Sequence, residues 1–353
     1  MTRPIFALGL LALGLASTGA RAAAAEPGAR SEVPIREVVL SDGARRYSVP
    51  IQVGATVIEA GLDSGSSGLR ILPGVLGEAD AKVVGGGDTY SYGSGAELDG
   101  VVGHAEVGVG TLAAPISVQL IRKVGCTAKV PKCPASRIPQ SQYGVQGDGL
   151  PGEGFKAIIG VNMAEAEVVS PLRAIGAERW IIELPRPGET TPGRLILNPT
   201  EAELTGYALL PVVAAYREQK GGLHDAVGGC ILNDTTGRKA CGALLMDTGA
   251  PGIAVVNGGL GGEPWAQGPA TLAFYDGRGR AEAAEKITTG LKAHASRLEF
   301  KSEPANPNTA IMSGLTAYFA FSVLYDPEHG LVGLRPRPPA PEGPQGMLVA
   351  NQP

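Results

Sequence analysis

One short pattern occurs twice in this chain, and it constrains the fold more than any other feature of the sequence. Residues 57–62 (Val-Ile-Glu-Ala-Gly-Leu) are mostly apolar and lead into residues 63–65 (Asp-Ser-Gly). Residues 242–246 (Gly-Ala-Leu-Leu-Met) lead in the same way into residues 247–249 (Asp-Thr-Gly), 184 positions further on (247 − 63). Each copy is typical of an apolar strand that ends in an acidic, hydroxyl-bearing loop. The separation is about the length of one lobe of a two-lobed protein.

The duplication has a chemical consequence if the two loops meet. The glycines that follow Asp63 and Asp247 allow close approach of the two backbones. Two carboxylates at hydrogen-bonding distance cannot both be ionised, so one pKa rises and the pair shares a proton. Such a pair titrates as a unit, activates a water molecule and protonates a leaving amine. The sequence therefore predicts a hydrolytic site at Asp63 and Asp247.

Composition and charge exclude several other classes. The chain has 30 Lys and Arg against 34 Asp and Glu, and this net charge of −4 argues against a nucleic-acid-binding protein. Charged residues are only 18% and aromatic residues 5%, whereas there are 52 glycines and 28 prolines. This composition disfavours long helices and favours short strands joined by turns, so we expect an all-β protein. The only helices expected are short, over 163–177, where Pro171 interrupts, and over 316–320.

Residues 1–22 are interpreted as a signal peptide. Arg3 supplies a positive charge, residues 5–16 are uncharged but too short to span a bilayer, and residues 20–22 (Ala-Arg-Ala) fit cleavage after Ala22, or else after Ala24. An N-terminal membrane anchor is the alternative. No later stretch approaches 18 apolar residues, so we expect an exported mature protein, periplasmic or secreted, with no membrane span.

The rest of the chain is predicted to form two lobes. About 300 residues exceed what one core usually serves, so we expect an N-terminal lobe over 33–180 and a C-terminal lobe over 181–335. Residues 336–353 are rich in proline with little to bury, and they are predicted to be a disordered tail. The segment between the cleavage site and Asp63 is short, so no inhibitory propeptide is expected.

The four cysteines form two close pairs in the sequence, and we expect two local disulfides, Cys126–Cys133 and Cys230–Cys241. An exported compartment permits them, and each would close a short loop. Zinc is the competing interpretation. No Cys-x-x-Cys spacing supports it, and the four histidines are scattered singly, so no metal site is expected.

The paired loops, together with further blocks, resemble the pepsin-like aspartic peptidases. This resemblance covers most of the chain from about Tyr47 to Pro336, and it implies an all-β, bilobal acid protease fold with two six-stranded, barrel-like lobes and a cleft between them. The blocks are a flap hairpin (90–95 and 98–103), strands that brace each aspartate loop (155–160 and 311–314) and closing strands (322–326 and 331–334).

The resemblance also implies roles for individual residues. Asp63 and Asp247 would be the catalytic pair of an exported aspartic endopeptidase that cleaves peptides or unfolded proteins, as a monomer and without a cofactor. The residues expected to support the pair are Ser64, Gly65, Ser66, Thr248 and Gly249, with the hydroxyls of Ser64 and Thr248 bonding across and Ser66 donating to Asp63. The flap residues Tyr92, Gly93 and Ser94 would close over the substrate.

Some positions depart from the family pattern. Ala250 replaces a hydroxyl residue of the second loop, so we expect a raised pKa at Asp247 and a less acidic pH optimum. Arg70 replaces a tryptophan that usually bonds the flap tyrosine, and Tyr92 follows Asp63 by only 29 residues (92 − 63). Ser313 and Leu315 also replace expected residues. The alternative function is a pepsin-fold binding or inhibitory protein whose cleft is catalytically weak or inactive.

Overall fold

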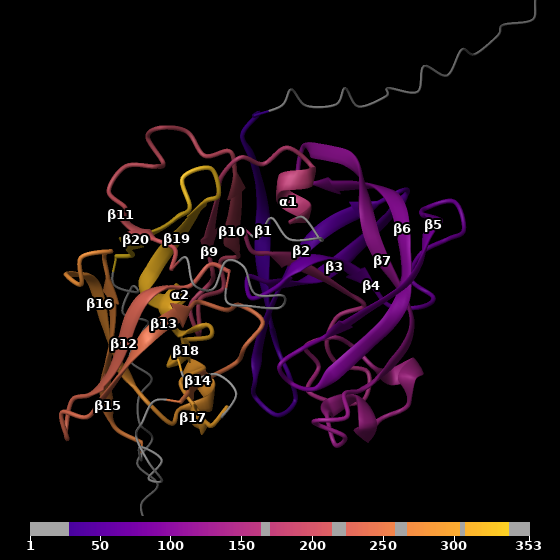
Figure 1. Cartoon of the computed structure of the whole chain (residues 1–353). Helices are drawn as coiled ribbons and strands as arrows, with labels where there is room; N and C mark the ends of the chain where they lie inside the picture. The colour runs from indigo at the N-terminus through magenta and orange to yellow at the C-terminus, as the bar shows by residue number, and fades with distance from the viewer. Residues whose placement is uncertain (1–27, 164–169, 214–223, 258–266, 304–307, 339–353) are drawn as a thin grey trace, which may run out of the picture.

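The computed structural model describes residues 28–163, 170–213, 224–257, 267–303 and 308–338 (Figure 1). Strands dominate these residues, which confirms the predicted all-β class. The two α-helices found there are short, α1 (Pro171–Ala174) and α2 (Thr316–Ala320). Helix α2 has the predicted bounds. Of the helix expected over 163–177, residues 164–169 lie outside the described residues, and α1 is the helix within the rest. Pro171 stands in its first turn, where a proline costs no hydrogen bond.

Within the described residues the larger sheet has thirteen strands, in the spatial order β11-β20-β19-β9-β10-β1-β2-β3-β8-β4-β7-β6-β5. Their bounds are β1 (Ser31–Val39), β2 (Arg45–Val53), β3 (Thr56–Asp63), β4 (Ser67–Ile71), β5 (Lys82–Ser91), β6 (Ala96–Val109), β7 (Leu112–Cys126), β8 (Ala157–Val161), β9 (Trp180–Glu183), β10 (Gly193–Leu197), β11 (Ala208–Pro211), β19 (Phe321–Asp326) and β20 (Leu331–Pro336).

In the same described ranges the smaller sheet has seven strands, in the order β16-β15-β12-β13-β18-β14-β17. Their bounds are β12 (Val227–Asn233), β13 (Lys239–Leu245), β14 (Ile253–Val256), β15 (Pro269–Tyr275), β16 (Ala281–Thr288), β17 (Leu298–Lys301) and β18 (Ala310–Met312).

The first half of the chain closes on itself through six strands. Strand β2 pairs with β3, β3 with β8, β8 with β4, β4 with β7, β7 with β6, and β6 again with β2. Alternate residues point inward, so Val49, Ile51 and Val53 of β2 are fully buried together with Val107 of β6. Closure removes most free strand edges and encloses an apolar core.

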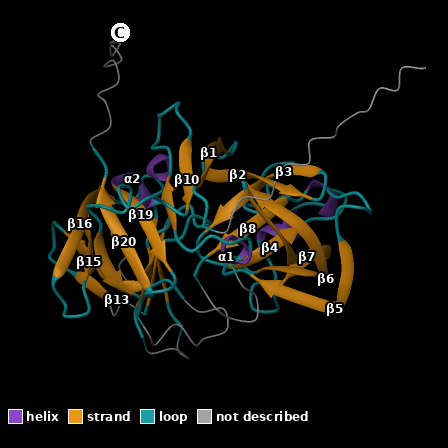
Figure 2. Cartoon of the chain, turned by 90° about the horizontal axis from the view of Figure 1, so that it is seen from above, coloured by secondary structure: helices purple, strands orange, loops and turns teal. Residues whose placement is uncertain are grey.

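The two halves are joined by a central layer of strands, which lies between β2 and β12 in Figure 1. Strand β9 pairs with β10 and with β19, and β19 pairs with β20, so the sheet continues across the middle of the molecule. Trp180 and Tyr325, from opposite halves, stack with ring centroids 5.8 Å apart and are almost fully buried. The residue boundary of 180/181 drawn from the sequence falls inside β9. Figure 2 shows the same layer from above, with β1 and β10 between the two groups of strands.

The C-terminal boundary differs from the prediction. Residues 336–338 are not part of a disordered tail, because β20 includes Pro336 and the Arg337 side chain donates hydrogen bonds to the carbonyl oxygens of Leu184 (2.6 Å) and Tyr318 (3.0 Å). A guanidinium with two backbone acceptors holds the chain end in place. The predicted signal peptide and the remainder of the tail, 339–353, lie outside the described residues. Across the described ranges, no helix is long and apolar enough to cross a membrane.

Candidate active site

Asp63 stands at the end of β3, where three strands hold it. Strand β3 runs parallel to β8 with Asp63 opposite Gly160, and β4 returns antiparallel to β8 with Gly68 opposite the same Gly160. A methyl group on Gly160 would lie 2.7 Å from backbone atoms of Ser66, so a glycine is needed where the loop packs on β8. The aspartate is 4% exposed as a result.

The second copy of the pattern is held in the same way. Strand β13 leads to Asp247 and runs parallel to β18, while β14 returns antiparallel to β18, and both contact Met312. Gly314 follows β18 with φ +58°, and an added Cβ there would lie 2.4 Å from the carbonyl oxygen of Gly252 and 2.7 Å from that of Ala250. The sequence block 311–314 therefore lies against the second aspartate loop, as 155–160 lies against the first.

The hydroxyl residues of the two loops bond across to each other. The Ser64 amide donates to Thr248 Oγ1, and the Thr248 amide donates to Ser64 Oγ, both at 2.9 Å. The Thr248 hydroxyl in turn donates to the carbonyl of Leu62 (2.9 Å), and the Ser64 hydroxyl to that of Met246 (3.0 Å). All four bonds are buried, where a hydrogen bond is costly to lose. They fasten the two loops together across the middle of the molecule.

Each loop glycine lies against the aspartate of the opposite loop. A Cβ on Gly65 would meet the Asp247 carboxyl carbon at 2.5 Å and its oxygens at 2.6 and 2.7 Å. A Cβ on Gly249 would meet Asp63 Oδ1 at 2.8 Å and its carboxyl carbon at 3.0 Å. Only hydrogen atoms fit in these gaps. The two glycines thus allow the two carboxyl groups to approach each other.

The two carboxyl groups have different hydrogen-bond donors. Asp63 accepts from the Gly65 amide (2.9 Å) and from the Ser66 hydroxyl (2.6 Å). Asp247 accepts from the Gly249 amide (2.7 Å), and Ala250 stands where the second hydroxyl would be. Burial raises the pKa of Asp247, and the charge of Asp63 raises it further. The sequence anticipated a raised pKa but gave the missing hydroxyl as its cause, whereas burial is the largest one.

A buried arginine that the sequence did not single out reaches the second loop from the first half of the chain. Arg46 of β2 is 2% exposed, and its Nε donates to the Gln146 carbonyl oxygen at 2.7 Å. Its Nη2 bonds to Asp148, and its Nη1 donates to the Gly249 carbonyl oxygen at 3.4 Å. The charge of Arg46 opposes the rise in the pKa of Asp247. No sequence motif marks this residue, because its partners lie in two segments, 146–148 and 249, far from it in the sequence.

Two tyrosines lie beneath the paired loops, and they too were missed. The hydroxyl of Tyr318 from α2 is 2.8 Å from Ser64 Oγ and 2.5 Å from the hydroxyl of Tyr325. Burial raises the pKa of Tyr318, so its hydroxyl stays protonated. The same hydroxyl donates to the carbonyl oxygen of Met246, just before Asp247, at a longer distance of 3.3 Å. A signal was available in part, since the helix 316–320 was predicted, but nothing in it indicated which side chain would face the site.

In the predicted flap hairpin, Tyr90 rather than Tyr92 hydrogen-bonds to Ser66, which donates to Asp63. Burial raises the pKa of Tyr90, while the charge of Arg70 and a hydrogen bond with Ser66 oppose the rise. The Tyr92 ring packs instead against a cluster of buried apolar side chains that includes Leu98 and Phe155, and its buried hydroxyl has no hydrogen-bond partner among the described residues. Successive residues of a strand point to opposite faces, so residues 90 and 92 share a face. Strand β5 ends at Ser91, so the turn that follows sets the position of the Tyr92 side chain.

Arg70 takes up the contact with the flap that a tryptophan would otherwise make. It lies on β4, is 3% exposed, and its guanidinium carbon stands 3.4 Å from the Tyr90 ring centroid and 5.8 Å from that of Tyr92. The two rings meet edge to face, with centroids 4.9 Å apart. A cation over an aromatic face is attracted by the ring electrons. Arg70 therefore connects the hairpin to the strand that follows the first aspartate.

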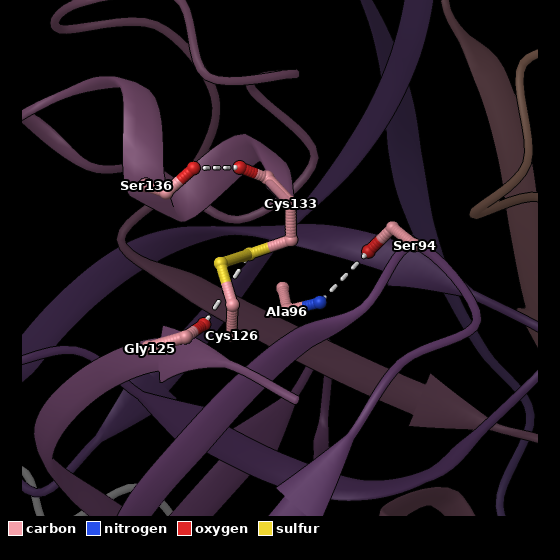
Figure 3. The surroundings of a disulfide bond; sticks show 6 residues. All are labelled: Ser94, Ala96, Gly125, Cys126, Cys133 and Ser136. Carbon is pink, nitrogen blue, oxygen red and sulfur yellow. Dashed lines mark hydrogen bonds between the residues drawn. A yellow bond between two sulfur atoms is a disulfide. The ribbon is translucent and has the colours of Figure 1, made fainter. Parts of the chain in front are cut away.

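The tip of the hairpin is braced by the first disulfide, Cys126–Cys133, whose sulfurs are 2.00 Å apart. Figure 3 shows this bond beside Ser94 and Ala96, and Ala96 is paired with Cys126 across β6 and β7. The Thr127 amide donates to the Gly95 carbonyl oxygen at 2.9 Å. Gly93 and Ser94 are exposed at the tip. The predicted flap residues thus lie at a turn fastened to the disulfide loop.

The second predicted disulfide, Cys230–Cys241, also forms, and it joins directly opposite residues of β12 and β13. Within the described residues, no group of three or more His, Cys, Asp and Glu side chains could hold a metal ion. Neither the known protein-family models nor the curated proteins include a match to this chain. The geometry of the site is therefore the basis on which a function is proposed below.

Proposed function

We propose that this protein is an exported aspartic endopeptidase with a bilobal, pepsin-like fold. The observation that carries the proposal is the reciprocal packing of each loop glycine on the opposite aspartate, Gly65 on Asp247 and Gly249 on Asp63. This packing occurs between two loops that have the same strand connections and are joined by mutual hydrogen bonds. A pair of carboxyl groups held so closely shares one proton, which is the requirement for acid and base catalysis in one site.

The hydrogen bonds assign different tasks to the two carboxyl groups. Asp63, with donors from Gly65 and Ser66, is the ionised partner and takes a proton from a water molecule. Asp247, with its raised pKa, is the protonated partner and donates its proton to the oxygen of the substrate carbonyl. The water oxygen bonds to the carbonyl carbon and gives a tetrahedral diol. The C–N bond then breaks, the proton held by Asp63 goes to the leaving nitrogen, and Asp247 recovers its proton from the diol.

Export is supported by two features of different kinds. The sequence of residues 1–22 has the pattern of a cleavable signal peptide. Both cysteine pairs form disulfides, which persist in oxidising compartments such as the periplasm or the medium. We propose unfolded proteins or peptides as substrates, because an extended chain can offer its backbone to a cleft between two sets of strands.

The test is cleavage of casein by the purified mature protein between about pH 3 and 7. We expect cleavage, its loss in Asp63→Asn and in Asp247→Asn, and its inhibition by a statine peptide that mimics the tetrahedral intermediate. The matched control is Asp234→Asn, which changes an exposed aspartate bonded to Thr271. No cleavage at any pH by a folded protein would contradict the proposal, as would activity that survives either active-site substitution.

The second candidate is a binding or inhibitory protein of the same fold. The observation in its favour is the position of Tyr92, whose ring packs into an apolar cluster and whose hydroxyl has no partner. A protein of this kind would bind the statine peptide, or another extended peptide, without cleaving casein. The two measurements together separate the candidates.

A further inference from the structure

Four buried polar atoms beneath the flap hairpin have no hydrogen-bond partner in the described part of the chain. They are Nε and Nη1 of Arg70, the hydroxyl of Tyr92 and Oε1 of Gln119. Arg70 and Gln119 are direct neighbours on the parallel strands β4 and β7, and Tyr92 lies within the reach of the Arg70 charge. The described residues contain only eight such atoms altogether, so half of them gather in this one place. Buried polar groups are normally paired, and a cluster of exceptions calls for a physical explanation.

The contacts already present do not satisfy these atoms. A guanidinium over the face of Tyr90 gains attraction for its charge, but its N–H groups point outward in its own plane and still need acceptors. The Gln119 amide nitrogen donates to the carbonyl oxygens of Asp88 (2.8 Å) and Leu98 (3.2 Å), and this fixes the side chain with Oε1 turned away from them. Both groups are thus held in place with unused hydrogen-bonding capacity.

The charge of Arg70 is also uncompensated by an acidic side chain. Among the described residues it makes no ion pair, although it is 3% exposed. Burying an unpaired charge costs several kcal/mol, so a buried arginine is normally paired with an anionic group. The partner that fits is planar and anionic, because a guanidinium binds a carboxylate through two parallel hydrogen bonds.

We infer that the unpaired groups of Arg70, Gln119 and Tyr92 beneath the hairpin form a subsite for a carboxylate of the substrate, supplied by a glutamate or aspartate side chain next to the bond that is cleaved. Arg70 binds the carboxylate, and the Tyr92 hydroxyl donates a further hydrogen bond. The subsite adjoins the aspartates, because Tyr90 stacks on Arg70 and hydrogen-bonds to Ser66, which donates to Asp63. Within the described residues, strand β5 is the last strand of its sheet and pairs only with β6, so the hairpin is held to the sheet along one side.

This inference rests on the proposed function for the position of the substrate, but a binding measurement can test it without turnover. We would compare two statine peptides that are identical except for Glu or Gln beside the statine, by calorimetry at about pH 6. The wild-type protein is expected to bind the Glu peptide at least about tenfold more tightly, as a charge-assisted pair in a buried site should. In Arg70→Met the ratio should fall to about one, and Arg70→Lys should keep part of it. The matched control is Arg36→Met, which removes an exposed arginine paired with Glu59.

Each outcome has a distinct meaning. A Glu preference lost only in Arg70→Met supports the subsite, and it does so even if casein is not cleaved, in which case the peptidase proposal alone fails. Equal binding of the two peptides by a wild-type protein that cleaves casein overturns the subsite and leaves the peptidase proposal intact. A preference that persists in Arg70→Met also overturns it, and binding of neither peptide overturns both. The wild-type ratio decides the matter if Arg70→Met does not fold.

Discussion

The two aspartate loops have the same strand connections but different hydrogen bonds. In each half, the strand before the aspartate runs parallel to a bracing strand, and the strand after it returns antiparallel to that same brace: β3, β8 and β4 around Asp63, and β13, β18 and β14 around Asp247. A short helix follows each brace, α1 after β8 and α2 after β18. The backbone thus presents the two carboxyl groups in equivalent ways.

The side chains around the loops break this equivalence. Ser66 donates to Asp63, whereas Ala250 at the matching position cannot donate to Asp247. The hydroxyl of Tyr318 lies closer to the Ser64 hydroxyl of the first loop (2.8 Å) than to the Met246 carbonyl oxygen before the second (3.3 Å), and the guanidinium of Arg46 bonds to the Gly249 carbonyl of the second loop. A chemically symmetrical pair would share its proton evenly, but these differences favour the proton on Asp247. A duplicated backbone therefore places the groups, and the unmatched side chains assign their roles.

The largest expected effect comes from filling the contact between the loops. Gly65→Ala should lower kcat/KM by at least about 100-fold, because its Cβ would displace the Asp247 carboxyl group. Gly249→Ala should lower it less, since its nearest contact with Asp63 is longer, 2.8 against 2.5 Å. Gly125→Ala is the control, because nothing lies within 4 Å of an added Cβ there. Steady-state kinetics on a peptide substrate gives kcat/KM for each variant. Equal losses of kcat/KM at both glycines would contradict the predicted difference between the two loops.

The next largest effect concerns stability. Ser64→Ala should lower the free energy of unfolding by about 2–3 kcal/mol, because it leaves the Thr248 amide without an acceptor and removes the bond with Tyr318. Thr248→Ala loses one fewer partner and should cost about 1–2 kcal/mol. Urea denaturation gives both values, with Ser117→Ala, near the surface, as the control. A larger cost for Thr248→Ala would show that the Tyr318 bond does not stabilise the first loop.

A third prediction uses the raised pKa of Asp247. An acid whose pKa is higher in the folded protein loses its proton first in the unfolded chain, so folding stability falls as the pH rises above the ordinary value of about 3.9. Asp247→Asn removes this penalty and should stabilise the protein by up to about 2 kcal/mol at pH 7, with little effect near pH 4. Asp63→Asn should give no such gain, because the Gly65 amide and the Ser66 hydroxyl donate to different carboxylate oxygens and an asparagine has only one acceptor oxygen. Thermal unfolding at both pH values measures these changes. A loss of stability in Asp247→Asn at pH 7 would contradict the prediction.

The smallest effect is a shift in the pH profile. Ala250→Ser gives Asp247 a hydroxyl donor that favours its ionised form, so the alkaline limb of kcat/KM should move to lower pH by up to about one unit. The unmodified protein should have its rate maximum above about pH 3.5, because the proton of Asp247 is retained to a less acidic pH. A maximum below that value, or a limb that Ala250→Ser leaves in place, would contradict the proposed role of Ala250.

Much of the fold followed from local patterns. The apolar residues before Asp63 and Asp247 predicted strands, and β3 and β13 lie there. Cysteine spacing predicted both disulfides. Of the helix predicted over 163–177, residues 164–169 lie outside the described residues and the short helix α1 lies within the rest. The tail begins later than predicted, because Arg337 donates to carbonyl oxygens that no local pattern indicates.

The sequence by itself determined which residues form the two loops, namely the two aspartates, their glycines and the hydroxyl residues beside them. A repeated motif can be recognised in a sequence without knowledge of the fold. Only the tertiary structure decided the neighbours that distinguish one loop from the other. Tyr318 bonds to a serine 254 positions away, and Arg46 reaches a carbonyl 203 positions away. It also decided that Tyr90 rather than Tyr92 meets Ser66, because the reach of a side chain depends on the turn and on the packing beneath it. Contacts of this kind form through space between distant segments, and nothing in either segment alone encodes them.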